Sequence, residues 1–259
     1  MDTLYLRFFA YIRLSISCLL IFSSSLIFAE PTIQIVTENT YPWNYLEENN
    51  SELKGFSTEL ITEVMNDASV DFEITVLPWA RAYNRALKNK NTLIYSIGRN
   101  IEREDKFIWI GKIFDFNNNI YGLKKDYKKP FKNISELKNC ITGVVRGGIF
   151  QRYFESHNFQ NIVLLDDYEQ IILLLKKGRI DCYGSSKIGA NYFLEHNGLK
   201  KGSVIQIFDI DDLKTDIYLA ANINSDLAFI NKIKESFIRI KESGRYLKIM
   251  QPIYDKQKD

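Results

Sequence analysis

Histidine and cysteine are scarce in this sequence, which limits the catalytic and metal-binding chemistry that it can hold. The chain has two histidines, His157 and His196, and three cysteines, Cys18, Cys140 and Cys182. Their spacing matches none of the short Cys/His patterns that bind zinc. No histidine follows an expected strand, and no segment matches a nucleophile motif. The sequence therefore predicts no metal, no cofactor and no catalytic residue.

An excess of charge of one sign is also missing. The chain contains 34 basic and 32 acidic residues, which gives a formal net charge of +2. These residues are scattered along the chain and form no like-charge tail. Because nucleic-acid binding normally requires a basic face, we expect no nucleic-acid partner.

Long apolar runs are absent except at the N-terminus. Arg7 and Arg13 precede the apolar segment LSISCLLIFSSSLIFA (residues 14–29), which ends on the small residue Ala29. A basic flank, a short apolar region and a small residue before the cleavage point are typical of a secretory signal peptide. The run is shorter than the roughly 20 residues of a membrane-spanning helix. We therefore expect residues 1–29 to be removed and the mature protein to be exported, with a retained anchor as the alternative.

Export would permit a disulfide between Cys140 and Cys182. Both cysteines lie in segments with strand-like sequences, CITGVV and RIDCYG. In such segments a small buried thiol is the commoner explanation. The sequence leaves both alternatives open.

Hydrophobic periodicity predicts two α/β units in tandem. The first unit alternates strands with helices, one of which is expected to be capped by Ser57: TIQIVTE, FSTELITEVMNDA, VDFEITVLP, WARAYNRALKNK and NTLIYSIG. The second unit follows residue 118 with CITGVV, GIFQRYFESHN, NIVLLD, DYEQIILLLKKG and IDCYGSS. Asp167 and Gln170 have the spacing of a helix cap. This order favours largely parallel sheets covered by helices, with ligands bound beyond the carboxyl ends of the strands.

Six motifs occur in an order that points to a known family. They are ENTYPWNY (38–45), LKGFSTEL (53–60), LPWARAY (77–83), YSIGRNIERED (95–105), ISELKNCITGVVRGG (134–148) and KKGRIDCYGSS (176–186). Together they resemble the family 3 periplasmic solute-binding proteins, the receptors of polar amino acid ABC importers, and in particular a branch that carries PWARAY. The resemblance implies a type II α/β fold, in which two lobes joined by two crossing strands enclose a cleft. Lobe 1 would comprise residues 30–116 plus 217–259, and lobe 2 residues 117–216.

The resemblance assigns the ligand carboxylate to Arg103. A planar guanidinium matches a carboxylate with two parallel hydrogen bonds. Ser96 and Gly98, on the preceding strand end, would complete this part of the site. The alternative is a surface ion pair between Arg103 and a neighbouring acid, Glu102 or Glu104.

The same resemblance places Tyr41 and Trp79 on opposite sides of the ligand, where aromatic rings stack on it. Trp43 would be a further wall of the site or part of the core of lobe 1. Glu38 would contact the distal end of the ligand, or would be an exposed loop acid.

In the second unit, Arg146, Gly147 and Gly148 precede a helix. Backbone N–H groups at a helix start bind anions, although the turn could simply require glycine geometry. Ser186 stands where amino-acid-binding members of the family carry an aspartate for the ligand ammonium. Because a buried unpaired cation is costly, either another acid such as Glu38 binds the ammonium or the ligand is not an ordinary α-amino acid.

These expectations combine into a periplasmic binding protein for a small polar solute that carries a carboxylate. The resemblance implies a monomer that closes its lobes on a small-molecule ligand and delivers it to a membrane ABC permease. Two alternatives are an enzyme on the same fold, of the dehydratase or hydrolase kind, and a ligand sensor that docks onto a membrane partner.

Overall fold

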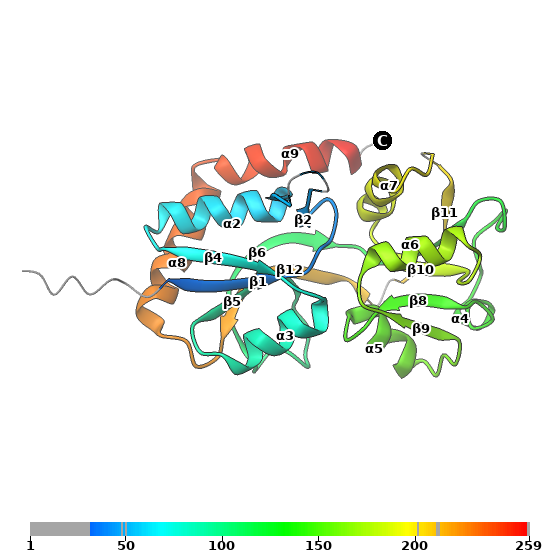
Figure 1. Ribbon diagram of the computed structural model, residues 1–259, viewed down its shortest axis with the longest axis horizontal. Helices are drawn as coiled ribbons and strands as arrows, with labels where there is room; N and C mark the ends of the chain where they lie inside the picture. Colours follow the sequence, from blue (N-terminus) through cyan, green and yellow to red (C-terminus); the bar gives the residue numbers. More distant parts are fainter. Residues whose placement is uncertain (1–31, 48, 50, 201, 211–212, 258–259) are drawn as a thin grey trace, which may run out of the picture. The chain divides into compact units, whose positions relative to one another are not determined.

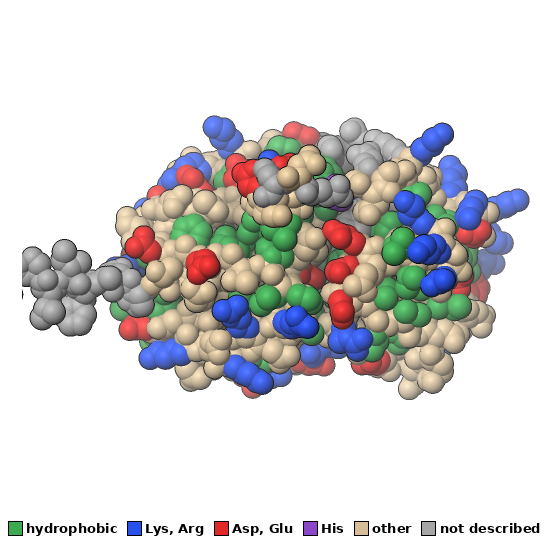
Figure 2. All heavy atoms as spheres, in the orientation of Figure 1, with side chains coloured by type: hydrophobic (Ala, Val, Ile, Leu, Met, Phe, Trp, Pro, Cys, Tyr) green, Lys and Arg blue, Asp and Glu red, His purple; other side chains and the backbone are tan. Residues whose placement is uncertain are grey.

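The computed structural model describes residues 32–47, 49, 51–200, 202–210 and 213–257 (Figure 1). The expected signal peptide (residues 1–29) lies outside the described residues. Within the described ranges, no helix is both long enough and apolar enough to cross a membrane. On the face shown in Figure 2, basic and acidic side chains are interspersed.

The first sheet combines a parallel part and an antiparallel part, in the strand order β4–β1–β5–β12–β6. Its strands are β1 (Ile33–Thr37), β4 (Phe72–Val76), β5 (Thr92–Gly98), β6 (Phe107–Phe116) and β12 (Thr215–Asn222). β1 pairs in parallel with β4 and β5, as the β-α-β-α-β pattern predicts. β12 runs antiparallel to β5 and β6. The expectation of a largely parallel sheet is therefore wrong for this edge, because β12 returns from the second sheet without a helical crossover.

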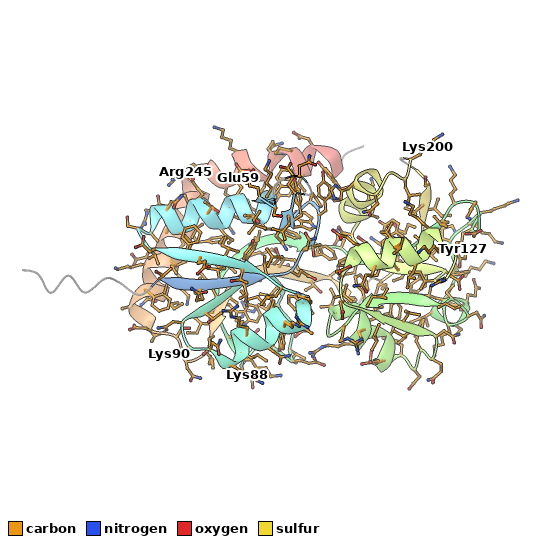
Figure 3. All side chains as sticks on the ribbon, in the orientation of Figure 1. Glu59, Lys88, Lys90, Tyr127, Lys200 and Arg245 are labelled. Atoms are coloured by element: carbon orange, nitrogen blue, oxygen red, sulfur yellow. The ribbon has the colours of Figure 1, made fainter. Side chains whose placement is uncertain are left out.

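Helices cover both faces of the first sheet (Figure 1). α2 (Phe56–Asp67), α8 (Leu227–Glu242) and α9 (Arg245–Gln257) lie over one face, and α3 (Trp79–Lys88) lies over the other. Arg245 binds two acids of α2, Glu63 at 2.8 Å and Asp67 at 2.7 Å (Figure 3). These two ion pairs hold the start of α9 against α2.

The expected Ser57 cap of α2 is wrong. The helix begins after Gly55, and the Ser57 side chain is buried without forming a cap. Instead, the carbonyl oxygen of Trp43 accepts the N–H groups of Ser57 (2.9 Å) and Thr58 (3.3 Å). Gly55 has φ 118°, and a Cβ atom there would lie 2.3 Å from the same oxygen. The loop after β1 therefore caps α2 through its backbone, which helix propensity alone does not reveal.

The second sheet has the strand order β11–β7–β10–β8–β9. Its strands are β7 (Asn119–Leu123), β8 (Thr142–Val145), β9 (Ile162–Leu165), β10 (Cys182–Ser185) and β11 (Val204–Asp209), and its helices are α4 (Ile134–Leu137), α5 (Ile149–Ser156), α6 (Tyr168–Lys176) and α7 (Lys187–His196). The predicted cap of α6 is confirmed, because the Gln170 N–H donates to Asp167 Oδ1 at 2.8 Å. Cys140 lies before β8 rather than inside it, which corrects the strand assigned to CITGVV.

Two segments connect the sheets, as expected for two crossing strands. The chain leaves the first sheet after β6 and returns to it at β12. Asn118 in the first crossing is buried, and its side chain donates to the carbonyl oxygen of Leu213 in the second. We call the first sheet with its helices the first lobe and the second sheet with its helices the second lobe. The expected lobe limits of 30–116 plus 217–259 and 117–216 stay a prediction.

Candidate ligand-binding site

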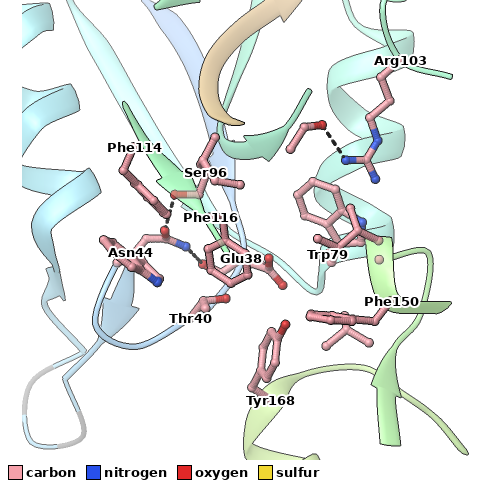
Figure 4. Close-up of a pocket in the computed structure, with 16 residues that line it drawn as sticks. Glu38, Thr40, Asn44, Trp79, Ser96, Arg103, Phe114, Phe116, Phe150 and Tyr168 are labelled. Carbon is pink, nitrogen blue, oxygen red and sulfur yellow. Dashed lines mark hydrogen bonds between the residues drawn. The ribbon is translucent and has the colours of Figure 1, made fainter. Parts of the chain in front are cut away.

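A small cavity of about 80 Å³ is lined by both lobes (Figure 4). The first lobe contributes the loop after β1, the start of α3, the end of β5 with the turn that follows it, and residues of β6 and β12. The second lobe contributes the end of β8 and the starts of α5 and α6. The following predicted site residues line this cavity: Glu38, Trp43, Trp79, Ser96, Gly98, Arg103 and Gly148.

Arg103 is fully buried in the cavity wall. Its Nη1 donates a hydrogen bond to the Gly98 carbonyl oxygen at 2.9 Å. The guanidinium carbon lies 5.2 Å from the ring centre of Trp79 and 5.1 Å from that of Tyr83. Burial lowers the pKa of Arg103, and Tyr83 and the negative charge of Glu38 oppose that shift. The guanidinium is therefore shielded from water, and the groups around it compensate little for the hydration that it has lost.

Two hydrogen-bond donors of this guanidinium are unused. In the part of the chain that the structure describes, Arg103 Nε and Nη2 have no hydrogen-bond partner. The acids beside Arg103 bind elsewhere, Glu104 to Arg99 and Glu102 to Arg152, so the alternative of a surface ion pair is not observed. Nε and one terminal nitrogen form an edge that a carboxylate can bind with two parallel hydrogen bonds. The geometry suits an anionic ligand group.

Glu38 extends from the end of β1 toward the middle of the cavity (Figure 4). Its carbonyl oxygen accepts a hydrogen bond from Asn44 Nδ2 at 2.7 Å, and Asn44 Oδ1 accepts one from Ser96 Oγ at 2.6 Å. Ser96 has φ 58° and lies where the pairing of β5 with β12 is irregular. Bulges and left-handed residues of this kind recur at binding sites. Ser96 and Asn44 therefore position the backbone that carries Glu38.

The Glu38 carboxyl group titrates near neutral pH. Burial raises its pKa from 4.5 to about 7, although the nearby Thr40 hydroxyl and the charge of Arg103 act in the opposite direction. Among the described residues that line the cavity, Glu38 and Arg103 are the only acidic and basic side chains. The cavity thus offers one group for a ligand anion and one for a ligand cation.

Aromatic side chains form much of the remaining wall. Trp79, at the start of α3, donates its indole N–H to the Gly147 carbonyl oxygen at 2.9 Å. Trp43 is stacked on Phe114 with ring centres 3.8 Å apart and belongs to the core of the first lobe. Trp43 is therefore a core residue that also lines the cavity, and its contact with a ligand stays a prediction.

The glycine turn before α5 has no free N–H group for an anion in this conformation. The Gly147 N–H donates to Gln151 Oε1 at 2.6 Å, and the Gly148 N–H donates to the Val145 carbonyl oxygen at 3.0 Å. Gly147 has φ 72°, in the region that favours glycine. Gly147 takes part in the site as the acceptor for Trp79. In this conformation the turn therefore serves to orient the Gly147 carbonyl oxygen toward Trp79.

Three other predicted residues lie outside the cavity. Arg146 is exposed, with its Nε 3.6 Å from Asp166 Oδ1. Tyr41 lines a neighbouring groove rather than the wall opposite Trp79. Ser186 Oγ accepts the N–H of Gly189 at 3.0 Å and begins α7. The serine at the position expected for an ammonium-binding aspartate is therefore engaged in capping a helix.

The two lobes are in direct contact around the cavity. Besides the bond of the Trp79 indole, Asn39 Nδ2 donates to Glu169 Oε1 at 3.0 Å. The rings of Tyr41 and His196 are stacked, with centres 4.5 Å apart. Because these contacts join the lobes on several sides of the cavity, this conformation is a closed one.

Phe150 in the cavity wall depends on the absence of a side chain at Gly184. A Cβ atom at Gly184 would lie 2.2 Å from the Phe150 ring. We expect Gly184→Ala to displace this ring and to lower the free energy of unfolding by about 1–3 kcal/mol, as overpacking does. Urea unfolding measures the change. Adding Phe150→Leu should restore part of the loss, and a Gly184→Ala protein as stable as the parent would contradict the assignment.

Residues 33–256 match the profile of the bacterial extracellular solute-binding proteins, family 3. The chain belongs to this family. The match covers both sheets and every residue of the cavity. A comparison with curated protein sequences finds no match.

Solved structures with the same fold include several solute-binding proteins. ArtJ, the arginine-, lysine-, histidine-binding protein of Geobacillus stearothermophilus, is 20% identical with a TM-score of 0.75, over 86% of this chain and 94% of that one. AbpA of Streptococcus pneumoniae, an amino acid ABC transporter substrate-binding protein bound to L-arginine, is 16% identical with a TM-score of 0.74, over 86% and 94%. A histidine kinase sensor domain similar to periplasmic binding proteins is 15% identical with a TM-score of 0.77, over 86% and 96%. At these identities the similarity shows a shared fold.

Nine residues that line the cavity were not predicted from the sequence of this family 3 protein. The missed residues are Thr40, Asn44, Phe114, Phe116, Val145, Ile149, Phe150, Tyr168 and Ile217. Tyr168 could have been predicted as a cavity residue from its position in the sequence. It is the first residue of α6, just as Trp79 is the first residue of α3. Helix starts that follow parallel strands face the same edge of a sheet. Applying that rule to both lobes would have found Tyr168.

Proposed function

We propose that this family 3 protein captures a small zwitterionic solute, an amino acid or a related compound. The ligand carboxylate binds the unused Nε and Nη2 edge of Arg103, and the ligand ammonium binds Glu38. The observation that supports this most directly is that one buried cation and one partly buried acid line a single cavity. Aromatic rings around these two groups exclude water and strengthen both interactions.

Glu38 replaces the aspartate that the resemblance places at the position of Ser186. Ser186 carries no charge, and its hydroxyl already accepts a backbone N–H. A ligand ammonium buried without an acidic partner would lose several kcal/mol of solvation. Moving the acid to the loop after β1 supplies that partner from the first lobe. The ligand charges are then both bound by the first lobe, and the second lobe contributes mainly aromatic contact.

Capture proceeds by lobe closure. A ligand favours the closed state by the amount that it binds that state more tightly than the open one. Here the ligand would first bind Arg103 and Glu38 in the first lobe, and Phe150 and Tyr168 of the second lobe would then cover it. The two crossing segments, joined by Asn118, act as the hinge.

The family supports a location outside the cytoplasm, and we propose export to the periplasm through residues 1–29. We further propose that the closed, liganded form acts as a monomer and delivers the solute to a membrane ABC permease. The protein then needs no cofactor and performs no catalysis, in keeping with the solute-binding description of its family.

A ligand panel tests this function through thermal unfolding. Binding to the native state stabilises it by RT ln(1 + [L]/Kd), which is about 2.7 kcal/mol at a ligand concentration of 100 Kd. We expect a small amino acid to raise the unfolding midpoint, and the matching carboxylate without an amine and amine without a carboxylate to raise it less. If α- and ω-amino acids, dicarboxylates and small oligosaccharides all leave the midpoint unchanged, solute capture is refuted. Turnover of a panel compound would favour the enzyme alternative.

A ligand sensor is the second candidate, and the similarity to a histidine kinase sensor domain favours it. Ligand capture by the cavity would be the same in both cases. The difference is the partner of the closed state, a transport permease or a signalling protein. Pull-down with the closed, liganded protein from membrane extracts distinguishes the two by the kind of membrane protein recovered.

A further inference from the structure

The two described cysteines are neighbours in the second lobe. Cys182 is the first residue of β10 and pairs with Thr142 of β8. Cys140 lies two residues before Thr142, at the entry to the same strand. Both cysteines are buried and in the thiol form. Neither takes part in the ligand cavity.

Several contacts bring the two thiols together. Thr142 Oγ1 lies 3.3 Å from Cys182 Sγ and 3.4 Å from the carbonyl oxygen of Cys140, to which it donates. The Ile141 carbonyl oxygen, next to Cys140 in the chain, accepts the N–H of Cys182 at 3.3 Å. The backbone of Cys182 is thus bound to Ile141 and Thr142, the two residues that follow Cys140 in the chain.

Tyr127, labelled in Figure 3, lies next to Cys140. Its hydroxyl lies 3.3 Å from Cys140 Sγ. Its ring covers Gly122, the residue of β7 that pairs with Cys182, so that a Cβ atom at Gly122 would lie 2.6 Å from the ring. One tyrosine therefore contacts the Cys140 thiol and shields the strand opposite Cys182.

We propose that Cys140 and Cys182 form a disulfide that links β10 to the segment entering β8. Cysteines on adjacent backbone segments can reach the short Cβ separation that a disulfide requires. The proposal does not depend on the ligand or on the proposed function. The disulfide would give a structural role to two buried cysteines that do not line the ligand cavity.

The oxidant would be a small or protein disulfide, R–S–S–R. The Cys140 thiolate attacks one sulfur of the oxidant, which forms a mixed disulfide and releases the first RSH after protonation. Cys182 then loses its proton and attacks Cys140 Sγ, which forms the Cys140–Cys182 bond and releases the second RSH. In sum, two protein thiols are oxidised and one oxidant disulfide is reduced to two thiols.

The electrostatics of the pair agree with this order of attack. The neighbouring Cys182 thiol lowers the pKa of Cys140, while burial and the neighbouring Cys140 thiol raise the pKa of Cys182. The thiol that ionises more easily is the better first nucleophile. Cys140 is also the less completely buried of the two.

The test refolds the full, reduced chain with oxidised glutathione, quenches it in denaturant with iodoacetamide and measures the intact mass. Apart from the label on Cys18, we expect a mass lower by two hydrogens, no alkylated cysteine at 140 or 182, and one peptide pair cross-linked between them. Reduction of this product should lower the thermal midpoint by on the order of 5 °C or more. Alkylation of both residues would overturn the proposal.

Single variants separate bond formation from a folding defect. In Cys182→Ser, Cys140 should accumulate as a glutathione adduct, because no second thiol can displace it. In Cys140→Ser/Cys182→Ser, the thermal midpoint should not respond to reductant. A parent protein that also retains a stable glutathione adduct on Cys140 would show that Cys182 does not reach it, and would overturn the proposal even if folding is normal.

Discussion

Replacement of Arg103 by methionine is expected to weaken ligand binding by about 30-fold or more. Removing one partner of a buried, hydrogen-bonded charge pair costs about 2–5 kcal/mol of binding free energy, and each 1.4 kcal/mol is a factor of ten. Isothermal titration with the ligand identified by the thermal panel measures this loss. Arg103→Lys keeps the positive charge but loses the planar edge. Its ligand affinity should therefore lie between those of the parent protein and Arg103→Met.

Arg103→Met should leave the ligand-free protein almost as stable as the parent protein. Methionine loses the hydrogen bond to the Gly98 carbonyl oxygen and the ring contacts of the guanidinium. It also removes a buried cation with two unused donors, which is itself destabilising. These effects oppose each other, and we expect a change in unfolding free energy of less than about 1 kcal/mol.

Arg99 provides a matched control for this experiment. It lies in the same turn, is partly exposed and binds Glu104 instead of facing the cavity. Arg99→Met should therefore leave ligand affinity unchanged. A large loss of stability in Arg103→Met with normal affinity would mean that Arg103 supports the fold and does not hold the ligand.

The parallel part of each lobe was predictable because its strands and helices carry strong periodic patterns. The spacing of Leu60, Ile61, Val64 and Met65 predicted α2, and all four are buried. The antiparallel pairing of β12 was not predicted, since pairing between distant segments leaves no local periodicity. The cap of α2 was missed for a related reason, because the Trp43 carbonyl oxygen that forms it belongs to a separate loop.

The first-lobe half of the cavity was predicted better than the second-lobe half. Glu38 directly follows β1, and Trp79 and Arg103 lie in the segments that follow β4 and β5. The resemblance to the family supplied their expected roles. In the second lobe, Gly147 and Arg146 were predicted to bind an anion because of their residue types. The hydrogen bonds that occupy the glycine turn, and the ion pair of Arg146, depend on side chains that only the folded chain brings near.

Glu38 should give the ligand-free protein an unusual pH dependence. Its pKa is about 7 in the folded protein, against 4.5 for the free side chain. Between these values the folded state binds more protons at Glu38 than the unfolded state does. The stabilising contribution is therefore complete below pH 4.5 and is lost as the pH rises through about 7.

Urea unfolding of the parent protein and Glu38→Gln measures this contribution. Glutamine keeps the shape of the neutral acid and does not titrate. From pH 4.5 to pH 8 the parent should lose about 2–3 kcal/mol of unfolding free energy relative to Glu38→Gln. Parallel pH profiles for the two proteins would contradict a raised pKa of Glu38.

Ligand affinity should change with pH in the opposite direction. If Glu38 binds the ligand ammonium, it must be ionised in the complex, so affinity should rise as the pH increases through about 7. In Glu38→Gln this rise should disappear, and affinity should be low at every pH, because the ammonium has no acidic partner. An affinity that falls with rising pH would instead mean that protonated Glu38 donates a hydrogen bond to the ligand. The ligand would then be an acid without an amine, bound through Arg103 and the protonated Glu38.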